Sequence, residues 1–146
     1  ELGVQEIIFW QSLRSIVRTA AGDLKKRTER LSKIAESAAR QSGQNYISRI
    51  SLFSDLDQAI AQTKSIATTG DGFLCCCFTP GAKLIRDLPR TDHCHILIGP
   101  ESDFDPTELQ LALSSGFEPV SLGPLRLRAE TASVASVAIV QGLWGS

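Results

Sequence analysis

Short apolar segments alternate with helical segments along most of this sequence, and this alternation constrains the fold more than any other feature. Apolar segments of strand length lie at 4–10, 47–52, 72–78, 95–98 and 119–122. Helices are expected at 24–42, 56–63, 106–115 and 130–144, with a further helix or turn at 82–88. Such an order predicts an α/β fold with a mostly parallel sheet and helices on both faces. Ligands in sheets of this kind bind at the carboxyl ends of the strands.

Two of the expected helices have clear local signals. Between Leu24 and Ser42, apolar residues recur at helical spacing with lysines and arginines on the other side, and Gly43 is placed to end the helix in a left-handed turn. For the helix at 106–115, Asp105 can cap the first turn, Pro106 suits its first position, and Glu108 completes a capping box. A polar, arginine-containing turn is expected at 11–18.

The size and composition favour one domain with an apolar core. The chain has 146 residues and is 42% hydrophobic, with no apolar run long enough for a membrane span and no secretory signal pattern, so a cytoplasmic protein is the simplest expectation. Its cysteines are Cys75, Cys76, Cys77 and Cys94. Because three of them are consecutive, they suit neither a disulfide framework nor a C-x-x-C metal knuckle, and we interpret them as reduced, mostly buried small side chains.

The basic charge is concentrated at the front of the chain. Residues 1–50 hold nine Lys/Arg against five Asp/Glu, whereas residues 51–146 hold six against eleven. Such a basic segment could face a phosphate backbone, although a charged helix is more often a solvated face. The charge distribution alone therefore favours a nucleic-acid partner only slightly.

Two of the expected strands run directly into glycine-proline loops. The first loop reads Leu-Ile-Gly-Pro-Glu-Ser-Asp-Phe from Leu97 to Phe104, and the second reads Leu-Gly-Pro-Leu-Arg-Leu-Arg-Ala-Glu-Thr-Ala from Leu122 to Ala132. Glycine lets backbone approach a ligand closely, and proline fixes the shape of a loop. The alternative interpretation is that glycine and proline simply end these strands.

Taken together, the two loops resemble the signature of the RsmE family of 16S rRNA (uracil-N3) methyltransferases. In that family one strand ends in I-G-P-E-G-G-F and a later one ends in L-G-x-x-I-L-R-x-E-T-A. The similarity extends upstream through 1–4 (ELGV), 29–30 (ER) and 36–42. The resemblance implies a SPOUT-class α/β fold whose last strand and helix thread a C-terminal trefoil knot. It also implies methylation of uridine N3 in 16S rRNA with S-adenosylmethionine as the methyl donor.

The resemblance also implies roles for particular residues. Expected donor-binding residues are Ile98, Gly99, Pro100, Glu101, Leu122, Gly123 and Leu127, where exposed backbone groups can bond an adenine edge. Expected RNA-binding residues are Arg126 of the second loop and, from the basic charge at the front of the chain, Arg14 and Arg18. Arg128 is expected to hold a phosphate or stabilise negative charge developing on the uracil, although it could instead pair with the nearby Glu130. Glu130 or Glu101 could accept the N3 proton, water is not excluded as the acceptor, and Glu130 can equally well cap the last helix.

The chain departs from the family signature in both loops. The glycine pair after Gly-Pro-Glu is Ser102-Asp103 here, and a residue with a Cβ pays roughly 1 kcal/mol or more if it must adopt a positive φ. Aspartate visits that region more readily than serine, so Ser102 is the greater concern. In the second loop the expected Arg and Ile are Leu125 and Arg126, which displaces the basic residue by one position.

The resemblance finally sets expectations for domains and partners. Residues 1–146 are expected to be a SPOUT methyltransferase domain lacking its first strand and helix and the family's N-terminal β-barrel RNA-binding domain. Expected partners are 16S rRNA, within the small ribosomal subunit, and a second copy in a homodimer, with no membrane and no metal. His93 and His95 could share a metal on one strand face, but no third ligand is evident. Alternative functions are a SPOUT methyltransferase acting on tRNA and a catalytically idle RNA-binding or assembly protein.

Overall fold

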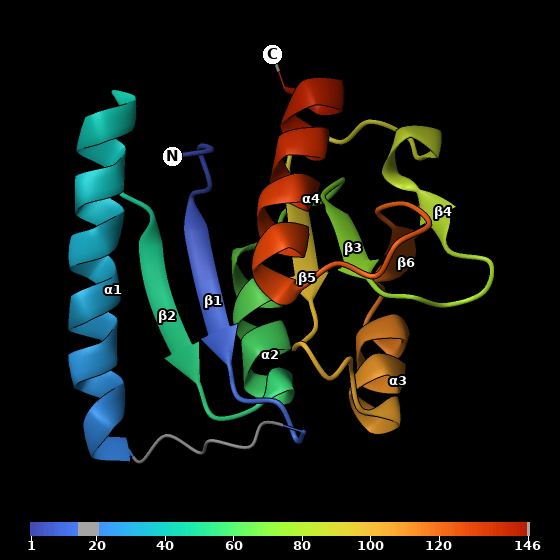
Figure 1. The fold of residues 1–146 in the computed structure, drawn as a ribbon, viewed down its shortest axis with the longest axis horizontal. Coiled ribbons are helices and arrows are strands. Elements are labelled where there is room, and N and C mark those ends of the chain that lie inside the picture. Colours follow the sequence, from blue (N-terminus) through green and yellow to red (C-terminus); the bar gives the residue numbers. More distant parts are fainter. Residues whose placement is uncertain (15–20, 146) are drawn as a thin grey trace.

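All strand pairings among the described residues are parallel. The computed structural model describes residues 1–14 and 21–145 (Figure 1). The elements are β1 (Glu6–Trp10), α1 (Ala21–Ser42), β2 (Arg49–Phe53), α2 (Leu56–Ile66), β3 (Gly72–Cys76), β4 (Lys83–Leu84), the 3-10 turn η1 (Ile85–Asp87), β5 (Cys94–Ile98), α3 (Pro106–Ser114), β6 (Glu118–Ser121) and α4 (Ala129–Trp144). The strands form a four-stranded sheet in the order β4-β6-β3-β5 and a separate β1-β2 pair. The expected α/β fold with a parallel sheet and helices is therefore confirmed.

Helices cover both faces of the four-stranded sheet. Successive residues of a strand point to opposite sides, so neighbouring residues of β3 belong to different cores. Cys75 of β3 belongs to a core shared with Leu56 and Ile60 of α2 and Ala112 of α3. Its neighbour Leu74 packs on the opposite face. There the core includes Ile85 of η1, Val120 of β6 and Trp144 of α4. Long α1 lies beside the β1-β2 pair (Figure 1).

Most of the expected elements are present within a few residues of their predicted ends. The segment 82–88 is the main exception, because residues 83–84 form a short strand on β6 before the 3-10 turn. Two residues are too few to carry a periodic sequence signal, so the helix-or-turn prediction missed this strand. The predicted strand 72–78 ends at Cys76, so Cys77 and Phe78 follow it as irregular chain. Of the turn predicted at 11–18, only 11–14 lies within the described residues.

The predicted capping box at the start of α3 is present and also anchors a distant part of the chain. The Asp105 side chain accepts from the Thr107 N–H, and Glu108 accepts from the Asp105 N–H. The buried Glu108 carboxylate also accepts from the Ser12 hydroxyl at 3.0 Å and from the Leu13 N–H at 2.7 Å. One carboxylate therefore joins the segment after β1 to the loop that precedes α3.

No helix in the described part of the chain is both long enough and apolar enough to cross a membrane.

Candidate functional site

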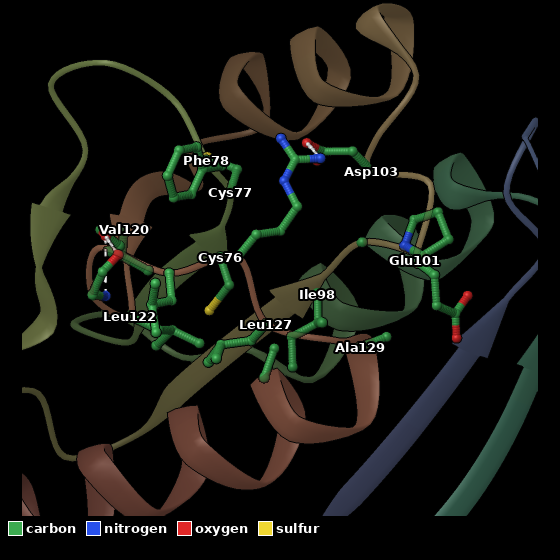
Figure 2. A pocket seen from close by; sticks show the side chains of 17 residues that line it. Cys76, Cys77, Phe78, Ile98, Glu101, Asp103, Val120, Leu122, Leu127 and Ala129 are labelled. Atoms are coloured by element: carbon green, nitrogen blue, oxygen red, sulfur yellow. Dashed lines mark hydrogen bonds and ion pairs between the residues drawn. The ribbon is translucent and has the colours of Figure 1, made fainter.

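A pocket lies at the carboxyl ends of β3, β5 and β6, where the two glycine-proline loops meet (Figure 2). The pocket opens to solvent, and the space within it, open solvent included, is about 590 Å³. Its walls include all seven residues predicted to bind the donor. They are Ile98, Gly99, Pro100, Glu101, Leu122, Gly123 and Leu127. The further lining residues used below are Cys76, Cys77, Phe78, Asp103, Leu125, Arg126, Ala129 and Ala132.

The loop after β5 is shaped by close packing at Gly99. A Cβ on this residue would lie 2.9 Å from Cε2 of Phe104, so glycine is required unless the ring moves. The ring is only 5% exposed and stacks on Trp10, with 6.2 Å between the ring centroids. The loop then closes with a hydrogen bond of 2.9 Å from the Asp103 N–H to the Pro100 carbonyl.

Asp103, and not Ser102, occupies the left-handed position of this loop. The φ of Asp103 is 69°, and among the described residues no other non-glycine residue has a positive φ. Its carboxylate accepts from the Phe104 N–H at 2.9 Å, which is the local hydrogen bonding that makes aspartate tolerable in this region. The expectation that Ser102 would be the more strained of the two residues is therefore wrong, because Ser102 does not have a positive φ.

The loop after β6 needs glycine for a different reason. Gly123 has a φ of 131°, and, its own chain neighbours apart, no heavy atom lies within 4 Å of where its Cβ would be. The Ser121 hydroxyl accepts from the Gly123 N–H at 3.2 Å and donates to the Gly123 carbonyl at 3.1 Å. The backbone therefore turns sharply at Gly123, and the absence of a side chain there leaves space beside the pocket.

An ion pair links the two loops. Nη1 of Arg126 lies 3.4 Å from Oδ2 of Asp103, as the dashed line in Figure 2 marks. The guanidinium carbon of Arg126 also lies 5.5 Å from the centroid of the Phe78 ring, which is within the range of a cation–π contact. Arg126 is thus the predicted RNA-binding residue that the structure places at the pocket.

Two thiols line the pocket, which the expectation of mostly buried cysteines did not foresee. Cys75 is fully buried, whereas Cys76 and Cys77 are half-buried at the pocket wall. A hydrogen bond from the Cys75 thiol, with a second from Thr79, lowers the pKa of Cys77 to about 6 against the opposing effect of burial. Burial raises the pKa of Cys76 to about 12. The sequence signal that could have indicated this is position, because Cys76 ends a parallel strand and Cys77 directly follows it.

The remaining predicted residues lie outside this pocket. Arg128 is the N-cap of α4 without a side-chain cap, and both it and Glu130 are exposed. They form no ion pair with each other, so the pairing alternative is not what the structure has. Arg14 braces the back of the first loop, donating to the Ser102 carbonyl at 3.1 Å and lying 3.8 Å from the Asp105 carboxylate. Arg18 lies outside the described residues.

The two histidines considered as metal ligands do not converge on one site. Nε2 of His95 is 2.9 Å from the Asp71 carboxylate, and its ring stacks on Phe73 at 4.8 Å. His93 is exposed. Within residues 1–14 and 21–145, no group of three or more His, Cys, Asp or Glu side chains is placed to hold a metal ion.

A pocket walled largely by backbone and apolar side chains at the carboxyl ends of parallel strands is typical of an α/β domain that binds a small ligand. The family comparison makes the class specific. Residues 1–141 match the RNA methyltransferase domain family, and the chain belongs to that family.

Sequence relatives and solved structures agree with this assignment. Ribosomal RNA small subunit methyltransferase E of Mesomycoplasma hyopneumoniae is 33% identical over 135 residues, which cover 92% of this chain and 56% of the relative. A structure of the same-named enzyme from Neisseria gonorrhoeae, bound to S-adenosyl methionine, has a TM-score of 0.84 and 30% identity, covering 98% of this chain and 56% of its own. A Legionella pneumophila methyltransferase in complex with the cofactor SAM has a TM-score of 0.85 and 29% identity. The match covers 97% of this chain and 56% of the Legionella chain. The chain thus spans little more than half the length of these relatives.

Proposed function

We propose that this chain is the methyltransferase domain of an RsmE-type enzyme, which transfers a methyl group from S-adenosylmethionine to N3 of a uridine in 16S rRNA. One observation carries the proposal. All seven residues assigned to donor binding from the sequence line a single pocket at the junction of the two signature loops. Solved relatives with TM-scores of 0.84 and 0.85 carry S-adenosylmethionine, which supports the same ligand here.

The residues present fit such a donor. Ile98, Leu122 and Leu127 give the pocket an apolar wall, and the open space beside Gly123 leaves room for a ligand against the backbone. Backbone groups of the two loops can then bond an adenine edge without charged side chains. When bound, the sulfonium centre supplies an activated methyl group, and the pocket's contribution is to fix its orientation.

Catalytic roles are proposed for residues at the edge of the pocket. Ala129 and Ala132 of α4 line it, so Arg128 and Glu130 on the same first turn lie close to its rim. Arg128 would hold an RNA phosphate or stabilise negative charge developing on the uracil. Glu130, or Glu101 in the pocket wall, would accept the N3 proton.

RNA contacts are proposed for three arginines. Arg126 lies at the pocket rim, Arg14 lies behind the first loop with its side chain 43% exposed, and Arg18 follows it in sequence. Guanidinium groups bind phosphates well because their donors form a rigid planar fork. Mutation of these residues should therefore weaken RNA binding and reduce its salt dependence.

A C-terminal trefoil knot and a homodimer are also part of the proposal. β6 is inserted between β4 and β3, the loop that follows it lines the pocket, and α4 then packs back onto the sheet. This path of the chain supports a threaded C-terminus. Val134 and Leu143 of α4 are exposed apolar residues, which supports a helix that meets a second copy. Sedimentation of the chain at several concentrations would test the dimer.

The substrate is tested by RNA analysis. In a strain lacking the gene that encodes this chain, we expect 16S rRNA to lose a 3-methyluridine that the wild-type gene restores. Loss of a tRNA modification instead would show that the enzyme acts on tRNA. Unchanged RNA modification, combined with salt-sensitive RNA binding and no donor binding, would show a catalytically idle RNA-binding protein.

A further inference from the structure

Phe78 is the most exposed aromatic side chain in the described part of the chain. It directly follows Cys77 after β3, is 56% exposed, and lines the pocket. Neither of the two hydrophobic core clusters includes it. Exposure of a large ring costs hydrophobic free energy and contributes little to stability, so the packing of the fold does not account for this side chain.

The surroundings of the ring match those of a base-binding surface. Arg126 lies 5.5 Å from the ring centroid, and the Asp103 carboxylate holds the guanidinium at 3.4 Å. Figure 2 shows Phe78 beside Cys77 on the side of the pocket away from Ile98 and Ala129. Proteins that act on a single base take it out of its stack and place it against aromatic rings or guanidinium planes, which also bind the neighbouring phosphates.

Position within the pocket separates this ring from the proposed donor site. The half-buried apolar residues Leu122 and Leu127 line the interior, whereas Phe78 and the still more exposed Leu125 form the solvent-facing rim. A base attached to an RNA chain must enter from solvent, because its phosphates stay hydrated. The Phe78 ring is therefore placed to contact the substrate, and the interior of the pocket is placed to hold the donor.

We propose that Phe78 is the stacking platform for the target uracil, an inference that rests on the proposed function. The uracil lies against the Phe78 ring at the mouth of the pocket, and Arg126, fixed by Asp103, binds the flanking phosphate. Phe78 is thus a positioning residue for the nucleobase and contributes nothing to donor affinity.

The test compares ring-removing and ring-retaining variants. Phe78→Leu keeps the apolar character and removes the stacking face, whereas Phe78→Trp keeps a stacking face. Probes are uridine 5′-monophosphate and a short oligouridylate, each titrated into the chain saturated with S-adenosylhomocysteine, with S-adenosylmethionine affinity measured separately. Tyr46→Leu is the matched control, because it removes another exposed ring that does not line the pocket.

The expected result is a selective loss of base binding. Stacking is worth about 1–3 kcal/mol per base, so Phe78→Leu should weaken uridylate binding by about tenfold. Phe78→Trp and Tyr46→Leu should bind uridylate as the wild type does, and all three variants should keep wild-type donor affinity. Retained donor affinity also shows that Phe78→Leu is folded.

Four outcomes would overturn the inference. Wild-type uridylate affinity in Phe78→Leu would show that the ring is not the platform, and a parallel loss of donor affinity would assign the ring to the donor. A wild-type chain that binds the donor but neither uridylate probe would overturn the platform alone. A folded wild-type chain that binds neither donor nor probe would overturn the proposed function, and the platform with it.

Discussion

Asp103 and Arg126 belong to different loops, yet their side chains meet at 3.4 Å across the mouth of the pocket. The pair is solvent-accessible, with side-chain exposures of 35% and 63%, so it contributes little to stability, roughly 0–1 kcal/mol. The ion pair matters for position. Asp103 holds its own loop in a turn with a φ of 69°, and its carboxylate also orients Arg126 of the second loop.

The backbone of Asp103 gives the first prediction. Asp103→Ala must keep a positive φ without the local hydrogen bonds, so it should lower the free energy of unfolding by about 1 kcal/mol relative to Asp103→Gly. Ser102 provides the control. Its φ is not positive, so Ser102→Ala should be at least as stable as Ser102→Gly. Chemical denaturation measures all four variants, and equal stabilities at position 103 would contradict the geometry.

Gly99 gives a prediction about packing. The methyl group of Gly99→Ala would meet the Phe104 ring at 2.9 Å, and the buried ring must shift against Trp10. We expect a loss of about 1–3 kcal/mol, the usual cost of overpacking a core. Adding Phe104→Leu to Gly99→Ala should relieve the clash, so the two changes together should destabilise by less than the sum of their separate effects. Strict additivity in a double-mutant cycle would mean that Gly99 and Phe104 do not interact.

The pocket thiols give a prediction about reactivity. Because the pKa of Cys77 is lowered to about 6 and that of Cys76 is raised to about 12, Cys77 should be a thiolate at neutral pH and Cys76 a thiol. Alkylation of Cys77 by iodoacetamide, followed by peptide mass spectrometry, should rise through about pH 6 and then level off.

Two further results check the cause of this reactivity. Cys75→Ala removes the principal hydrogen-bond donor and should move the midpoint toward higher pH. Saturating S-adenosylmethionine should slow the alkylation, because Cys77 lines the proposed donor pocket. A Cys77 that reacts only above about pH 8, like an ordinary thiol, would contradict the hydrogen-bonding scheme.

Asp71 gives a prediction about pH and stability. Hydrogen bonds from the Thr68 backbone N–H and hydroxyl, and from His95, lower the pKa of Asp71 below its usual value. A carboxylate with a lowered folded-state pKa stabilises the fold above its unfolded-state pKa, which is near 3.8, and loses that contribution as the pH falls.

Asp71→Asn should therefore be less stable than the wild type at neutral pH, and the difference should shrink as the pH falls below about 4. Urea denaturation across this range measures both proteins. Asp57→Asn is a suitable control, because Asp57 is an exposed aspartate of α2. A constant difference in stability between Asp71→Asn and the wild type at all pH values would show that the ionised Asp71 carboxylate does not stabilise the fold.

Local signals in the sequence predicted local structure well. The capping box of α3 depends on Asp105, Pro106 and Glu108, which are close in sequence, and the structure has it. The family resemblance predicted that both glycine-proline loops bind the donor, and their expected position at the carboxyl ends of parallel strands agreed with it. Both loops do line the same pocket.

Long-range relationships were not predictable in the same way. Glu108 binds Ser12 and Leu13, which lie 96 and 95 residues away, and no periodicity reports such a contact. Arg14 carries no sequence signal that it braces the Ser102 carbonyl. The exposure of Phe78 also depends on the point where β3 stops pairing, which a run of apolar residues does not reveal.

Calorimetric titration of S-adenosylmethionine into this chain tests the central claim most directly. We predict saturable binding with micromolar affinity, abolished by Gly123→Trp, whose side chain would fill the open space beside the second loop. Wild-type affinity in Gly123→Trp would place the donor elsewhere. A folded chain that binds no S-adenosylmethionine would contradict the account.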